Sequence, residues 1–142
     1  MRRNFEFALI VVIISILTIL VMQALERARR SAEEATMQIE VTAIRAQLME
    51  VAVHHETFGG KLPNSKNPMD WINNRPANYR GASDVAPRER GGWHFDSAAE
   101  ELVYLFHDGH SARFRLSRDA GRTDGRGMPA GIGLLRLDDQ MQ

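Results

Sequence analysis

The hydrophobic pattern of the chain begins with an unbroken apolar run from Phe7 to Leu25, FALIVVIISILTILVMQAL, which contains no charged residue. A helix rises about 1.5 Å per residue, so this run would span about 30 Å, the thickness of the hydrocarbon core of a bilayer. A single segment in lipid must satisfy its backbone hydrogen bonds internally, which requires a helix. The pattern therefore predicts a transmembrane helix over residues 7–25, preceded by a short tail over residues 1–6.

Two other interpretations fit this run less well. A cleavable signal peptide has an apolar region of about 7–15 residues and a small-x-small cleavage site, and the residues around Ala24 offer no such site. An amphipathic helix on the membrane surface needs a polar face, and only Ser15, Thr18 and Gln23 interrupt the run. We therefore expect the anchor to be retained, with membrane lipid around it.

The helical pattern continues past the apolar run, because no proline or glycine occurs between Leu25 and Gly59. Small and apolar residues recur there at alternating steps of three and four, which predicts a narrow seam along one side of an amphipathic helix over residues 26–58. The seam consists of Leu25, Ala28, Ala32, Ala35, Ile39, Thr42, Ala46, Met49 and Val53.

Only the later half of this helix has a second apolar stripe, which predicts that this half packs on a folded domain. The stripe consists of Ile44, Leu48, Val51 and Ala52. Gly59-Gly60 predicts the end of the helix. The seam itself has two interpretations, a homodimeric coiled coil or lateral packing among several partners. Alanine buries little area at about 25 cal/mol per Å², which favours the second.

Residues 61–91 contain four prolines and many polar residues, which predicts an irregular loop. Within it, Asn67 as N-cap and Pro68 as first residue predict one short helical turn. We expect Trp71 and Tyr79 to hold this loop on the core, with a binding role as the alternative.

From Gly92 onward the pattern changes to a period of two, which predicts a small antiparallel sheet. Asp108-Gly109 is a hairpin turn signal, and residues 132–137 can supply a last strand. The candidate core face consists of Trp93, Phe95, Val103, Leu105 and Phe114. The predicted fold class is α+β: a long N-terminal helix, part membrane span and part amphipathic, packed on a sheet within a domain of residues 59–142.

Composition adds few constraints. The 18 basic and 18 acidic residues balance, so no long-range field favours nucleic acid as a partner. Cysteine is absent, which removes disulfides and thiol nucleophiles. Arginines flank the apolar run on both sides, so charge alone does not orient it in a membrane.

The order of these elements resembles that of type IV pilins and type II secretion pseudopilins: basic tail, membrane helix with an amphipathic extension, loop, antiparallel sheet. The run Phe7–Leu17 is similar to the N-terminal segment of that family. Gly92–Asp96 followed by Glu101–Tyr104 is similar to the first hairpin of minor pilin-like proteins. Asn67–Trp71 and Pro76–Gly81 are similar to a loop of accessory proteins of the mannose-sensitive haemagglutinin (MSHA) pilus.

The resemblance implies an inner-membrane protein with its N-terminus in the cytoplasm and its C-terminal domain in the periplasm. It also implies that the helix packs against other pilin-like subunits or assembly proteins, or against copies of itself. The residues assigned to this packing are Glu6, Leu25, Ala28, Ala32, Ala35 and Ile39.

The chain departs from the family at the processing site. Asn4, where the family has glycine, precedes Phe5, and Glu6 is second rather than fifth counted from Phe5. These departures argue against cleavage by prepilin peptidase, and for an accessory role in assembly rather than that of a bulk filament subunit.

No motif for catalysis or cofactor binding is visible, so we expect neither an enzyme nor a cofactor. His107 and His110 flank Asp108 at a spacing that a metal could use, but hairpin turns are commonly polar and we expect no metal site. Arg113 and Arg115 read as a solvated face; with Trp71 and Tyr79 they are the candidate partner surface.

The leading hypothesis is therefore a non-enzymatic pilin-like component that assists assembly of an MSHA-type pilus or of a type II secretion pseudopilus. The alternative is a single-pass envelope adaptor or sensor that dimerises through its helix and binds a ligand with its periplasmic domain.

Overall fold

The computed structural model describes residues 1–118 and 132–137. It divides into two compact units, Met1–Met37 and Gln38–Gln142. The first unit is helical from Arg2 onward, and the second contains the end of the same helix, a 3₁₀ turn and a sheet.

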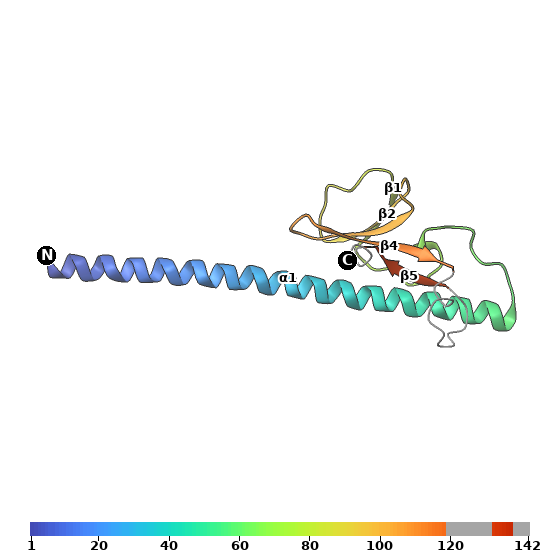
Figure 1. Cartoon of the computed structure of the whole chain (residues 1–142), viewed down its shortest axis with the longest axis horizontal. Coiled ribbons are helices and arrows are strands. Elements are labelled where there is room, and N and C mark those ends of the chain that lie inside the picture. Colours follow the sequence, from blue (N-terminus) through green and yellow to red (C-terminus); the bar gives the residue numbers. More distant parts are fainter. Residues whose placement is uncertain (119–131, 138–142) are drawn as a thin grey trace. The chain divides into compact units, whose positions relative to one another are not determined.

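Helix α1 runs without interruption from Arg2 to Phe58 (Figure 1). It ends where Gly59 and Gly60 take up the left-handed conformation that favours glycine, with φ of +72° and +118°. The Gly59 N–H donates to the carbonyl of His55 at 2.9 Å, which closes the last turn. The predicted helix end is confirmed. By length and composition α1 is also able to cross a membrane, through its N-terminal part.

The predicted turn after the helix is present as a 3₁₀ turn, η1, Pro68–Asp70. Asn67 caps it by accepting a hydrogen bond from the backbone N–H two residues on, at 3.0 Å. The Asn67 amide also donates to the Tyr79 hydroxyl at 2.9 Å, and the buried Trp71 indole donates to the carbonyl of Ser65 at 2.8 Å. The predictions that Asn67 caps this turn and that Trp71 and Tyr79 hold the loop are confirmed.

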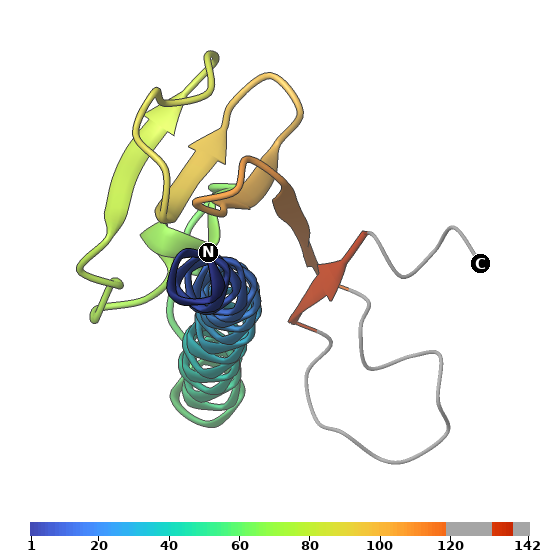
Figure 2. The same ribbon diagram turned by 90° about the vertical axis from the view of Figure 1, so that its left-hand side faces the viewer.

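The sheet has five strands among the described residues, in the order β1-β2-β3-β4-β5 (Figure 2). The pairs β2–β3, β3–β4 and β4–β5 are antiparallel, as predicted. The strands are β1 Tyr79–Ser83, β2 Gly92–Asp96, β3 Glu101–Leu105, β4 Ser111–Ser117 and β5 Gly133–Arg136. The Asp108-Gly109 turn lies between β3 and β4, and Gly109 has a φ of +98°.

Strand β1 lies in the segment predicted to be an irregular loop, so that prediction is wrong for residues 79–83. It pairs with β2 in parallel, with Tyr79 opposite Trp93, so the sheet is mixed rather than wholly antiparallel. The β1 side chains are half-buried or exposed, and an edge strand of this kind has little need of apolar alternation. Backbone hydrogen bonds hold it in place, and these leave no mark on the sequence.

One face of the sheet carries the aromatic core. The register places Trp93 opposite Tyr104 and Phe95 opposite Leu102, and Leu102 is also opposite Phe114. Residues directly opposite one another share a face. One side of the sheet therefore carries Trp93, Phe95, Leu102, Tyr104 and Phe114. Trp93 is fully buried, and its ring meets that of Tyr104 edge-on with centroids 4.9 Å apart.

Val103 and Leu105 lie on the other face, so the prediction that they share a face with Trp93 and Phe114 is wrong. A period of two fixes the faces within one strand only. The turn between two strands fixes their register, and a slip of one residue exchanges the faces. Here the turn places the even-numbered residues of β3 on the side of the odd-numbered residues of β2.

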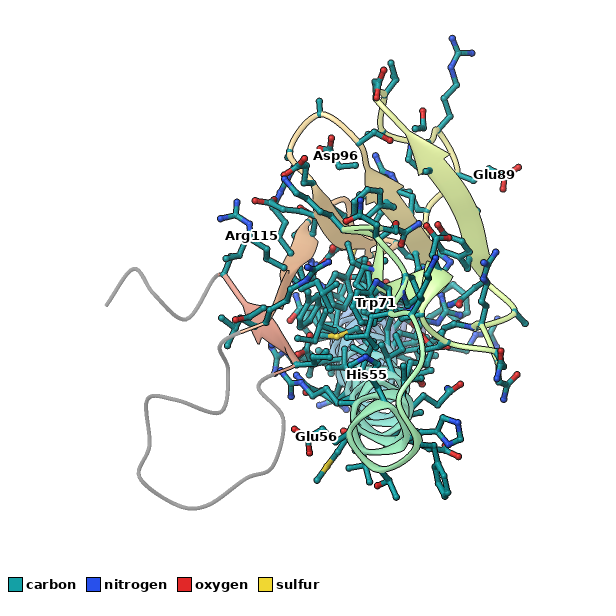
Figure 3. All side chains as sticks on the ribbon, turned by 90° about the vertical axis from the view of Figure 1, so that its right-hand side faces the viewer. His55, Glu56, Trp71, Glu89, Asp96 and Arg115 are labelled. Carbon is teal, nitrogen blue, oxygen red and sulfur yellow. The ribbon has the colours of Figure 1, made fainter. Side chains whose placement is uncertain are left out.

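Within the second unit, α1 covers the aromatic face, and Figure 3 shows side chains filling the space between helix and sheet. The buried helix stripe contains Val41 together with the predicted Ile44, Leu48 and Ala52, and Val51 is half-buried beside it. The Arg45 guanidinium donates two hydrogen bonds, at 3.1 and 3.0 Å, to the carbonyl of Leu134 in β5. The predicted α+β class, with a long N-terminal helix packed on a sheet, is confirmed.

Candidate helix-packing surface

In the first unit, every residue assigned to helix packing is exposed: Glu6, Leu25, Ala28, Ala32 and Ala35. The membrane-spanning candidate buries none of its side chains within the structure. Its hydroxyls are satisfied inside the helix, since Ser15 donates to the carbonyl of Val11 at 2.7 Å and Thr18 to that of Ile14 at 2.8 Å. Apart from the Gln23 amide, this segment therefore presents apolar surface and hydroxyls that are satisfied inside the helix.

In the second unit, the rest of the seam is exposed as well. Ile39 is 70% exposed, and Thr42, Ala46, Met49 and Val53 follow it along the helix. Small side chains beside Ile39 leave a shallow apolar groove there.

Within the second unit, the exposed seam residues and the buried stripe lie on opposite sides of α1. Ala46 is two residues from both Ile44 and Leu48, which is about 200° around a helix. One face of the helix is thus occupied by the sheet, and the opposite face is apolar and uncovered within the described residues.

A carboxylate that was not singled out from the sequence connects helix and sheet. Glu40 accepts a hydrogen bond from the Trp93 indole at 2.6 Å and a longer one, at 3.5 Å, from the Asn78 amide. Its position in the sequence contains a weak signal, because Glu40 stands between the buried residues Met37 and Val41 on the apolar side of the helix. An acidic residue there needs a partner.

The candidate partner surface does not form one patch. Trp71 is buried, and Tyr79 is half-buried against Asn67, which places both in the support of the loop. Arg113 and Arg115 lie on the sheet face opposite the core, and both donate to Glu101, at 3.0 and 2.8 Å.

Burial and charge shift the pKa of two groups on this outer face. Burial is the main reason that the pKa of His94 lies below 6.5; Arg113 and Arg80 lower it further, and Asp96 opposes them. The His94 Nδ1 is buried and has no hydrogen-bond partner in the described part of the chain. The N–H of Ala99 is the main cause that lowers the pKa of Asp96 below 3.8.

The histidines near the hairpin turn have other contacts. His110 Nδ1 pairs with Asp108, and its ring stacks on Phe106 with centroids 3.9 Å apart. In residues 1–118 and 132–137, no three metal-binding side chains come together.

The chain matches no family model, no curated protein and no solved structure.

Proposed function

We propose that this chain is a non-enzymatic, membrane-anchored, pilin-like component that assists assembly of a type IV pilus of the MSHA kind or of a type II secretion pseudopilus. Helix α1 carries the proposal. It is one uninterrupted helix with a part apolar enough to cross a membrane and a later part whose one face is under a sheet. Its opposite face is left apolar and exposed.

That exposed face suits packing against other helices. Small side chains such as Ala28, Ala32 and Ala35 let a second backbone approach closely, which is how helices associate in membranes. Each alanine contributes little buried area, so single contacts are weak and many must form together. Such a surface fits a protein that joins and leaves an assembly.

The proposed topology places residues 1–6 in the cytoplasm, the span in the inner membrane and the sheet in the periplasm. The order of elements supports it. Retention of the anchor is supported by Asn4, which stands where a glycine would be needed before Phe5.

Deleting the gene in the native host tests the assembly role. We expect fewer surface filaments by electron microscopy, or loss of secretion, with recovery when the wild-type chain is restored. Unchanged filaments and unchanged secretion in the deletion strain would exclude the proposal.

Cross-linking tests the surface itself. Because the chain has no cysteine, an Ala32→Cys variant carries a single thiol on the seam, and Arg30→Cys carries one about 200° around the helix. Oxidation of membranes should cross-link the first variant and not the second. Equal cross-linking of both would show that the seam is not the contact.

A further inference from the structure

A pocket lies at the end of α1, where the chain turns back along the helix. Its volume is about 340 Å³, within the usual range of small-molecule sites. One wall comes from the last turns of the helix, and the other comes from residues 59–63 and 72–73. All of these residues belong to the second unit.

The two walls are held together by a side chain that bridges them. Gln47 donates to the carbonyl of Asn74 at 3.1 Å and accepts from its N–H at 3.1 Å. These two bonds fix the returning segment against the helix, so the pocket has a defined width.

The pocket has an apolar lining with polar groups around it. The apolar part consists of Val51, Leu62, Pro63 and Ile72. Glu50, His54, His55 and Lys61 supply a carboxylate, two imidazoles and an ammonium group. Figure 3 shows His55 on the side of α1 toward Trp71, whereas Glu56 points to another side.

Two charged side chains of opposite sign, Glu50 and Lys61, line this pocket, and both are exposed. In the described part of the chain, neither Glu50 nor Lys61 makes a hydrogen bond or ion pair. The charged groups on the outer sheet face differ, since Glu101 holds two arginines there. As far as residues 1–118 and 132–137 are concerned, the two opposite charges of Glu50 and Lys61 are therefore available to a ligand that carries both.

We propose that this pocket binds a free α-amino acid with an apolar side chain. The apolar lining would take the side chain, Lys61 and the imidazoles would donate to the carboxylate, and Glu50 would accept from the ammonium group. This site is independent of the seam on α1, so it stands or falls separately from the assembly role.

The test is calorimetric titration of the full chain in detergent micelles with leucine and with phenylalanine. Two partial ligands, 4-methylpentanoate and isoamylamine, each lack one of the charged groups of leucine and keep its carbon skeleton otherwise. We expect saturable binding of at least one amino acid below about 10 mM, and at least tenfold weaker binding of both partial ligands.

Variants locate the site. Lys61→Met and Glu50→Gln should each weaken amino-acid binding at least tenfold. The matched controls are Lys66→Met and Glu56→Gln, whose side chains do not line the pocket, and these should bind as the wild type does. Thermal unfolding of each variant verifies that it is folded.

Three results would overturn the proposal. They are no saturable binding of either amino acid, binding of 4-methylpentanoate or isoamylamine as tight as that of leucine, or a loss of binding in the controls as large as in the pocket variants. None of these results bears on filament assembly, which the gene deletion tests by itself.

Discussion

At the scale of single residues, Glu40 joins helix to sheet through the hydrogen bond that it accepts from the buried Trp93 indole at 2.6 Å. Replacing Glu40 with alanine leaves that indole N–H without a partner, which costs about 1–3 kcal/mol. We expect Glu40→Ala to lower the melting temperature of the full chain in detergent. The near-ultraviolet circular dichroism of its tryptophans measures this unfolding. Glu40→Gln keeps an acceptor for the indole N–H, so its melting temperature should fall less. Glu56→Ala should leave the melting temperature unchanged.

His94 should make the stability of the sheet depend on pH. Its pKa in the folded chain is below 6.5 because it is buried, with Arg113 and Arg80 lowering it further against Asp96. The unfolded chain therefore binds a proton at a pH where the folded chain does not, and stability falls as the pH falls below about 6.5. Melting temperatures at about pH 7.5 and 5.5 measure this.

Two matched variants test this prediction. His94→Gln should reduce the difference between the melting temperatures at the two pH values. His54→Gln removes an exposed imidazole and should leave that difference unchanged. If His94→Gln kept the full difference, other groups would be responsible for it.

At the scale of elements, the two faces of α1 should respond differently to truncation. Leu48 is fully buried against the sheet, so Leu48→Ala should cost about 2–5 kcal/mol and lower the melting temperature by about 10 °C or more. Met49 is 39% exposed on the opposite face, and Met49→Ala should change the melting temperature little. A silent Leu48→Ala would mean that the helix does not stabilise the sheet.

The elements also show what could be predicted from the sequence. The helix, its glycine end, the Asn67 cap and the antiparallel strands each depend on local signals, such as periodicity or a turn residue, and each was predicted correctly. Two features were predicted incorrectly. Residues 79–83 form strand β1 and not a loop, and Val103 lies on the sheet face opposite Trp93. Both depend on pairing between segments, which backbone hydrogen bonds and turn geometry decide.

The seam could be located from the sequence because its residues recur along one side of the helix, and the structure leaves them exposed. That the seam packs against other helices stays a prediction. The hydrogen bond from Trp93 to Glu40 and the two from Arg45 to the carbonyl of Leu134 could not be predicted, because each joins residues far apart in the chain. A polar side chain on a helix does not show in sequence which distant group it will meet.

At the scale of the whole molecule, the anchor should be retained. The absence of a cleavage site near Ala24 and of a glycine before Phe5 leads to this prediction. Intact-mass measurement of protein extracted from membranes should give the mass of the full chain, with or without its first methionine. A chain that begins at Phe5 or beyond Ala24 would contradict it.

The direction of the chain in the membrane can be tested with a reporter. Alkaline phosphatase fused after the sheet should be active if the second unit is periplasmic, because that enzyme needs an oxidising compartment. An inactive phosphatase, together with an active cytoplasmic reporter at the same position, would reverse the topology.

The order in which the helix and its cover occur along the chain has a consequence for biosynthesis. The stripe of Val41, Ile44 and Leu48 leaves the ribosome before any strand of the sheet that later buries it. Until β2, β3 and β4 have followed, both sides of the helix are apolar and uncovered, and the Trp93 partner of Glu40 does not yet exist. During that interval the nascent chain exposes apolar surface of the kind that promotes aggregation, and folding of the sheet onto the helix ends this exposure.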